Sequence, residues 1–287
     1  MAKPRRLDTR ALGLDLGSEL VRFATGRENL HYGYWHEGLE VCIGNLRQAQ
    51  EAYTEKVKSF MPQRKLRVLD IGGGCGEFAK ELAADGHEVE IVVPSATLAA
   101  RCRENVGPSV PVHLKRFFEF RAAPRFDLCL FSESLQYMPP EEALHHAQQC
   151  LAIDGEILVS DCFRSQQFYE EFRDAPLVGG GHSLELFREV LATGRYQTLR
   201  EEDITESVAP SVDLEQQLYN FLGMSLKRID EELSVIYPRR RKLLHFVLYR
   251  LMSERRQTRL KRRLFGQYKN SSLFCRYNRY LILSLKA

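Results

Sequence analysis

The stretch VLDIGGGCGEF, residues 68–78, decides the fold of this 287-residue chain. A short run rich in β-forming residues ends in closely spaced glycines, and a helical pattern begins directly after them. Glycines at such a junction let the chain turn tightly and let a ligand approach the backbone. The stretch therefore predicts a strand, a ligand-binding loop and a helix in that order.

Strand-like and helical patterns alternate along the chain on the C-terminal side of this stretch. The predicted strands cover residues 66–73, 87–93, 111–118, 125–134, 155–163 and 196–204, and a last strand ends the chain. Helical patterns of ten to fifteen residues lie between most of them, with Ser95 as an N-cap and Pro140 in a first turn. This alternation predicts an α/β fold with a doubly wound, seven-stranded Rossmann-like sheet, whose ligands bind at the C-terminal strand ends.

The remaining segments are predicted to be helical additions to the sheet. Residues 1–62 form an N-terminal helical cap with an aromatic loop, HYGYWHEG, at residues 31–38. Residues 63–204 form the core, residues 205–276 a basic helical insertion, and residues 277–287 the final core strand. Insertions of this length are usually functional, and we expect this one to cover the ligand pocket as a lid.

The composition excludes several classes of protein. The formal net charge is +3, and no apolar run approaches the ~20 residues of a membrane-spanning helix. The basic N-terminus lacks the apolar core of a secretory signal. The seven cysteines are odd in number and form no C-x-x-C pair, which predicts reduced thiols, a cytoplasmic location and no metal site.

The glycine loop also excludes two common nucleotide sites. In G-x-G-x-x-G counted from Gly72, Glu77 occupies the third glycine position, and counted from Gly74, Ala79 does. Dinucleotide binding therefore fits poorly, and the chain contains no P-loop motif.

What the loop does contain is Asp70 followed by Gly72, Gly74 and Gly76. This D-x-G-x-G-x-G pattern resembles the first motif of class I S-adenosylmethionine-dependent methyltransferases, and the resemblance continues through FDLCLFSESLQYM and DGEILVSD. It is similar to the small-molecule type, which includes natural-product, sterol and cyclopropane-forming enzymes. The resemblance implies S-adenosylmethionine as cofactor and S-adenosylhomocysteine as product. It also implies that Asp70 organises the amino-acid end of the cofactor while the three glycines make room for it.

The resemblance extends to other cofactor contacts with some departures. The family usually ends its second strand with an acid that binds the ribose, but this chain has Val93 there, and Ser95 offers a hydroxyl instead. After the third strand, Phe118 and Glu119 stand where adenine contacts are expected. Ser132, at the end of the fourth strand, completes the expected cofactor set.

The acceptor side is predicted from aromatic residues. The HYGYW segment resembles a region that closes over the cofactor in small-molecule methyltransferases, and aromatic faces attract a sulfonium. Tyr34 is accordingly expected at the cofactor, and Tyr32, Trp35 and Tyr137 at the substrate. The alternative is that Tyr32, Tyr34 and Trp35 only pack the N-terminal helices on the sheet.

Two residues are candidates for catalysis. Glu133 ends the fourth strand, where a carboxylate takes a proton or stabilises a developing cation, or else only helps to bind the cofactor. His182 follows three glycines after the fifth strand and is either a general base or a cap of the next helix. Oxygen and carbon acceptors both stay open, whereas the absence of an N/D-P-P-Y/F motif argues against N-methylation of nucleobases or of protein glutamine.

A basic run in the insertion leaves the question of partners open. Residues 238–263 contain eleven Lys or Arg and one acid, Glu254. Three interpretations compete: a lid helix, with residues 243–252 over an apolar substrate; an anionic membrane surface, which would make the protein peripherally membrane-associated; and an acidic carrier protein or anionic substrate. Nucleic acid is disfavoured because no recognised binding module is present.

Two functions follow from the sequence. The first is a methyltransferase acting on an oxygen or carbon of a small, apolar or amphipathic metabolite, as in secondary metabolism. The second is a catalytically silent Rossmann-like module that binds a membrane or an anionic partner through its basic helix.

Overall fold

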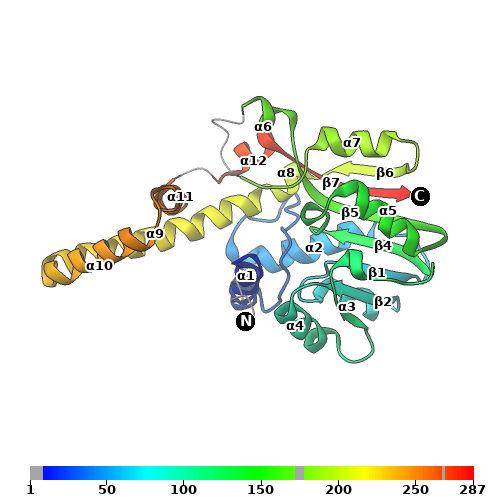
Figure 1. Ribbon diagram of the computed structural model, residues 1–287, viewed down its shortest axis with the longest axis horizontal. Coiled ribbons are helices and arrows are strands. Elements are labelled where there is room, and N and C mark those ends of the chain that lie inside the picture. The colour runs from blue at the N-terminus through cyan, green and yellow to red at the C-terminus, as the bar shows by residue number, and fades with distance from the viewer. Residues whose placement is uncertain (1–8, 172–177, 267–268) are drawn as a thin grey trace, which may run out of the picture.

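The computed structural model describes residues 9–171, 178–266 and 269–287, and a seven-stranded sheet forms its centre (Figure 1). The strand order is β3-β2-β1-β4-β5-β7-β6, and β7 alone runs antiparallel to its neighbours. The strands are β1 (Arg67–Ile71), β2 (Glu88–Val93), β3 (Val112–Leu114), β4 (Phe126–Ser132), β5 (Leu151–Arg164), β6 (Gln197–Asp203) and β7 (Asn278–Lys286). The doubly wound Rossmann-like sheet is thereby confirmed.

Helices cover both faces of the sheet because successive strand residues point to opposite sides. Val68 and Leu130 pack with residues of α2 and α3 in one apolar cluster, whereas Leu69 and Phe131 pack with residues of α5 and α7 in another. The helices are α1 (Thr9–Thr25), α2 (Leu46–Lys58), α3 (Glu77–Ala84), α4 (Ala96–Val106), α5 (Pro140–Cys150), α6 (Gln166–Glu170), α7 (Leu184–Ala192), α8 (Thr205–Val208), α9 (Pro210–Ile236), α10 (Pro238–Leu251), α11 (Glu254–Phe265) and α12 (Ser271–Tyr277).

Several predicted boundaries hold, but those of the third and fifth strands do not, and β5 begins at Leu151 instead of residue 155. Ser95 is the N-cap of α4, with its hydroxyl accepting from the Leu98 amide at 3.4 Å, and Pro140 is the first residue of α5. The third strand was predicted over residues 111–118 but ends at Leu114. A 3₁₀ turn over Phe117–Glu119 replaces its second half, because Phe117 and Phe120 are both buried and their spacing of three is helical.

The predicted insertion divides into two parts. Its first and last helices, α8 and α12, pack on the sheet, and the Tyr280 amide of β7 donates to the Thr205 hydroxyl at 2.8 Å. Between them, α9 and α10 project away from the body of the molecule (Figure 1). The expectation that residues 243–252 cover the ligand pocket is therefore not met, and Phe246 on α10 is 65% exposed.

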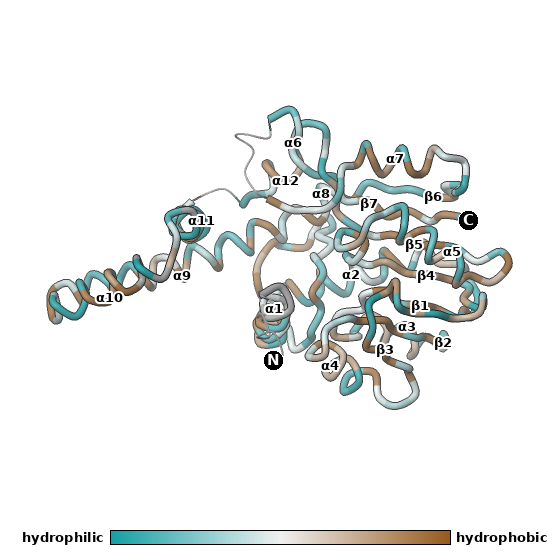
Figure 2. The backbone as a smooth tube through the Cα atoms, in the orientation of Figure 1, coloured by the Kyte–Doolittle hydropathy of each residue, from teal (hydrophilic) through white to brown (hydrophobic). Residues whose placement is uncertain are grey.

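Hydropathy along the backbone agrees with this division. Figure 2 shows that apolar residues gather in the strands, whereas α9 and α10 alternate between apolar and polar positions. Among the described residues, none of the helices combines the length and the apolar character needed to cross a membrane.

Candidate cofactor and acceptor site

The glycine loop joins β1 to α3 at the C-terminal edge of the sheet. Gly72, Gly74 and Gly76 all have positive φ angles, of 83°, 55° and 82°, which favour glycine. A Cβ on Gly72 would collide with Ser134, and one on Gly76 would collide with Cys102. The loop is thus held closely between two neighbouring segments, and its backbone is the surface that it offers to a ligand.

Asp70 lies beneath this loop with 2% of its surface exposed. A Cβ on Gly73 would collide with the Asp70 carboxylate, so the carboxylate and the loop backbone are in close contact. Burial raises the pKa of Asp70 to about 7, and its Oδ2 atom has no hydrogen-bond partner among the described residues. An unpartnered, buried carboxylate oxygen beside a glycine loop is suited to a positively charged group.

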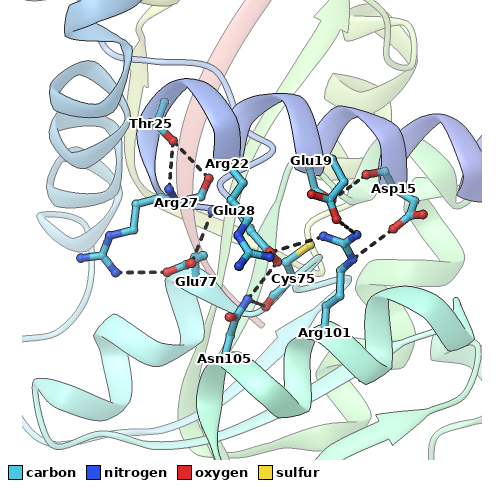
Figure 3. Close-up of polar contacts among 11 residues, drawn as sticks. Asp15, Glu19, Arg22, Thr25, Arg27, Glu28, Cys75, Glu77, Arg101 and Asn105 are labelled. Atoms are coloured by element: carbon cyan, nitrogen blue, oxygen red, sulfur yellow. Dashed lines mark hydrogen bonds and ion pairs between the residues drawn. The ribbon is translucent and has the colours of Figure 1, made fainter.

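The segment that follows α1 lies against the start of α3 (Figure 3). Arg27 Nη1 donates to Glu77 Oε2 at 3.2 Å, and the Glu28 amide donates to Glu77 Oε1 at 3.3 Å. Glu77 directly follows the last glycine of the loop, so the N-terminal segment and the loop share one anchor.

Glu28 extends this contact to α4 (Figure 3). Its buried carboxylate accepts from Arg101 Nη1 at 3.3 Å and from Asn105 Nδ2 at 3.1 Å, and Asn105 also donates to the Cys75 carbonyl in the loop at 2.9 Å. Arg101 binds Asp15 of α1 as well, at 3.1 Å. We call Glu28, Arg101 and Asn105 the latch, because they tie the N-terminal segment to α4 and to the glycine loop.

Glu133 stands at the end of β4 in a strained backbone conformation, with φ of 53°. Its Oε1 atom accepts from the Tyr32 amide at 2.9 Å and from the Tyr280 hydroxyl at 2.8 Å. Burial raises the pKa of this carboxyl to about 7, and the two hydrogen bonds oppose that rise by stabilising the charged form. Tyr32 and Glu133, both predicted from the sequence, are therefore brought together.

A chain of hydroxyls leads away from Glu133 into the core. The Tyr53 hydroxyl lies 2.7 Å from the Tyr280 hydroxyl and 2.7 Å from Ser160 Oγ. Because Tyr280 donates its single proton to Glu133, Tyr53 must donate to Tyr280 and accept from Ser160. All three hydroxyl protons are thus oriented toward one carboxylate.

Two further residues support the turn Leu135–Tyr137 that follows Glu133. Asp161 of β5, which is buried, accepts from the Gln136 amide at 3.0 Å, and burial raises its pKa to about 8. The His182 Nε2 atom lies 3.2 Å from the Leu135 carbonyl oxygen. A carbonyl only accepts, so Nε2 carries the proton in this contact.

The alternative interpretation of His182 as a helix cap is wrong. The N-cap of α7 is Ser183, whose hydroxyl accepts from the Leu186 amide at 3.4 Å. His182 instead holds the turn behind Glu133, so the two predicted catalytic residues lie on the same structural unit.

The aromatic residues of the HYGYWHEG segment lie in different surroundings. The Tyr32 ring meets Tyr280 edge-on with centroids 6.0 Å apart, close to Glu133. Tyr34 lies under the Lys56 ammonium of α2, at 5.7 Å. Trp35, predicted to bind substrate, is instead a core residue that is 6% exposed and donates its indole N–H to Ser211 Oγ at 2.9 Å.

The other predicted residues are spread along the strand ends. Val93 is buried in a small apolar cluster with Leu98. The Ser95 hydroxyl accepts a hydrogen bond from the Leu98 amide as the N-cap of α4. Phe118 is partly buried in the 3₁₀ turn, where the exposed Glu119 accepts from the backbone of its own turn at 3.4 Å.

Two predicted residues lie beside Glu133 in the sequence. Ser132 Oγ lies 3.4 Å from the Tyr53 hydroxyl, at the edge of the hydroxyl chain. Tyr137 is 48% exposed at the end of the supporting turn.

Sequence reasoning missed Tyr53, Tyr280 and His31. Tyr53 lies in the predicted N-terminal helical cap and Tyr280 in the predicted last strand, and no local signal marks either as a polar partner of Glu133. His31 stacks on Tyr53 with ring centroids 4.4 Å apart, and burial lowers its pKa to about 4. Its Nε2 atom has no hydrogen-bond partner among the described residues.

A comparison with models of known protein families identifies the family of this chain. A family model described as "Methyltransferase domain" matches residues 46–218, more than half of the chain. The chain belongs to this methyltransferase family. The match extends from the start of α2 into α9, so it contains the glycine loop, Glu133 and His182.

A curated relative supports the same family. The chain is 27% identical over 122 residues to an uncharacterized methyltransferase of Staphylococcus carnosus (strain TM300). The match covers 42% of this chain and 58% of the relative, so the chain spans little more than half of the relative's length.

Two solved structures share the fold. A cyclopropane synthase of Mycobacterium tuberculosis superposes with a TM-score of 0.65 at 15% identity, covering 99% of both chains. A geranyl diphosphate C-methyltransferase of Streptomyces coelicolor A3(2) superposes with a TM-score of 0.62 at 14% identity, covering 93% of this chain and 91% of its own. At these identities the likeness shows the fold alone.

The latch predicts a measurable effect on the N-terminal segment. Arg101→Met removes one of the two cations beside the buried Glu28 carboxylate, the other being Arg22 at 3.4 Å, and hydrogen bonds to charged groups contribute about 1.5–3 kcal/mol. Amide hydrogen exchange of residues 27–32 should therefore speed up by about tenfold or more. The matched control is Arg103→Met on the same helix, because Arg103 binds the Val112 carbonyl instead. Equal exchange in the two variants would show that the latch does not hold the segment.

Proposed function

We propose that this chain transfers a methyl group from S-adenosylmethionine to an oxygen or carbon of a small, apolar or amphipathic acceptor. Membership of the methyltransferase family and the loop of three left-handed glycines over Asp70 support the cofactor. The position and partners of Glu133 support the acceptor side.

The residues at the glycine loop fit the amino-acid end of this cofactor. The cofactor supplies a methyl group that is already activated on a sulfonium, so the protein mainly has to hold and align it. The loop backbone of residues 72–76 would hold the amino-acid end, and Asp70 Oδ2 is available to a cationic ammonium group. Leu30 lies 3.8 Å from a Cβ position on Gly74 and would cover the loop.

The residues expected near the ribose of the cofactor fit it less closely. Val93 supplies no carboxylate, and the Ser95 oxygen already accepts from the Leu98 amide. The Ser95 hydroxyl can still donate its proton, so it remains our candidate for a ribose contact. Phe118 and Glu119 remain the candidates next to adenine, on the 3₁₀ turn after β3.

The hydrogen bonding and burial of the Glu133 carboxyl are the observation on which the proposed chemistry depends. Both hydrogen bonds that the described residues make to its carboxylate go to Oε1, which leaves Oε2 for a ligand. With a pKa of about 7, the group can accept a proton from an oxygen acceptor near neutral pH. For a carbon acceptor, the same carboxylate would stabilise a developing cation. His182 acts through the turn that it holds and is a positioning residue.

The proposed acceptor class draws on two structural relatives. One of them is named for geranyl diphosphate, and the other is a cyclopropane synthase. The partly exposed Tyr32 ring packs edge-on against the buried rings of Phe274 and Tyr280, and Tyr32 is the aromatic residue beside Glu133 that supports an acceptor with an apolar part. Tyr137, exposed at the end of the supporting turn, is a further candidate for acceptor contact.

Cofactor binding is tested directly by calorimetric titration with S-adenosylhomocysteine. Gly72→Val should abolish binding, because the side chain collides with Ser134 and the positive φ angle disfavours a β-branched residue. Gly13→Ala on α1, with open space at the Cβ position, should bind like the wild type. Absence of binding to the wild-type protein would contradict the proposal and favour the silent module instead.

The titration of Glu133 is tested by NMR on protein labelled with ¹³C at the glutamate carboxyls. One resonance should titrate near pH 7 and disappear in Glu133→Gln. Tyr280→Phe should move this pKa upward, because the lost hydroxyl stabilised the charged carboxylate. Turnover should accordingly rise with pH through about 7 in the wild type, and at a higher pH in Tyr280→Phe.

The matched control for this experiment is Tyr277→Phe, which changes a tyrosine that donates to Glu171 instead. Its glutamate titration near pH 7 should equal that of the wild type. A Glu133 resonance that titrates near pH 4.5 would overturn the assignment of this residue as a base.

A further inference from the structure

The hairpin of α9 and α10 beyond Leu222 forms an arm that stands clear of the sheet (Figure 1). Asp230 of α9 holds α10 in place by binding the Arg241 guanidinium at 2.8 and 2.7 Å and His245 Nε2 at 2.7 Å. At the base of the arm, Gly223 lies in contact with the Leu264 backbone of α11. Two faces of α9 are thus covered, one by α10 and one by α11.

One remaining face of α9 is apolar and exposed. Its residues alternate at spacings of four and three, which places them along one side of the helix over two heptads. They are Leu222, Leu226, Ile229, Leu233 and Ile236, and we call them the seam. Ile229 is 56% and Ile236 59% exposed, and both line a shallow hollow together with Leu233. Such a pattern is typical of a helix that packs against another helix by knobs in holes.

We propose that the seam binds a second copy of this chain, with the two α9 helices antiparallel across a twofold axis near Ile229. The seam is symmetric about that residue, so Leu222 meets Ile236 of the second copy and Leu226 meets Leu233. An isologous contact requires such self-complementarity.

The charges beside the seam agree with this pairing. Arg228 and Glu232 border the hollow and lie on either side of the proposed axis, one residue before Ile229 and three residues after it. In an antiparallel pair, Arg228 of each copy lies on the same side of the contact as Glu232 of the other, about two residues or ~3 Å apart along the helix axis, which is within reach of these long side chains.

The local charge disfavours binding of the seam to an anionic membrane. Residues 222–236 contain two basic and three acidic side chains, so this stretch of α9 is slightly negative. The basic run of residues 238–263 lies on α10 and α11 instead. A bilayer of anionic lipids would therefore gain little from contact with the seam.

The size of the contact requires both helices of the arm. The seam spans fifteen residues of helix, or about 22 Å, and stable interfaces bury ~800 Å² on each partner. Leu244 of α10 is also exposed. With Asp230 and Arg241 facing each other, helical spacing turns Leu244 to the same side of the arm as the seam. Two arms thus form a four-helix bundle.

The test is sedimentation velocity over a hundredfold range of protein concentration. Wild-type protein should sediment at twice the 33.2 kDa of one chain, and Ile229→Glu with Leu233→Glu should sediment as a monomer. Leu243→Glu, on the face of α10 turned away from α9, is the matched control and should stay dimeric. Circular dichroism and S-adenosylhomocysteine binding should be unchanged in both variants, because the seam lies outside the glycine loop.

Charge reversal tests the antiparallel register separately. Arg228→Glu and Glu232→Arg should each weaken the dimer by about fivefold or more, and the double variant should restore it. A wild-type monomer at all concentrations, or a dimer unaffected by the seam substitutions, would overturn the proposal. So would a monomer that co-sediments with phosphatidylglycerol-containing vesicles and loses this binding in the seam variant.

Discussion

The turn from β1 into α3 is the constraint around which the C-terminal edge of the sheet is built. Three residues with positive φ within five positions restrict this turn to glycine, and the neighbouring Ser134 and Cys102 leave no room for a side chain at positions 72 and 76. The turn also covers Asp70, which keeps a buried carboxylate oxygen beside the loop backbone. The N-terminal segment depends on the same turn, because the Glu28 amide donates to Glu77 and Asn105 links the Glu28 carboxylate to the Cys75 carbonyl.

The carboxylate at the end of β4 depends on a different kind of constraint. Burying Glu133 disfavours its charge, and the hydrogen bonds from Tyr32 and Tyr280 restore part of the lost solvation. These partners come from an N-terminal loop and from the last strand, and Tyr53 of α2 orients the Tyr280 hydroxyl. The carboxylate is thus positioned by segments that are distant in sequence, and only the folded chain gives it a pKa near neutrality.

The candidate site was predictable where the signal was local. Glu133 follows a recognisable buried strand, and parallel strands end at one edge of the sheet, so its proximity to the glycine loop follows from the fold class. Trp35 and Tyr34 lie in an aromatic segment close to Tyr32, yet Trp35 donates to Ser211 and Tyr34 lies under Lys56. Which aromatic residue faces the site depends on how α2 and α9 pack around the loop, and residue type alone does not reveal this.

The sequence by itself determined the order of strands and helices, the glycine loop and the Ser95 cap, because each depends on propensities and spacings within a few residues. The tertiary structure alone decided that Tyr53 and Tyr280 meet Glu133, that Glu28 binds Arg101 and Asn105, and that the insertion projects as an arm. These outcomes depend on side chains that lie far apart along the chain. Their distances follow from the packing of whole elements, which no local pattern encodes.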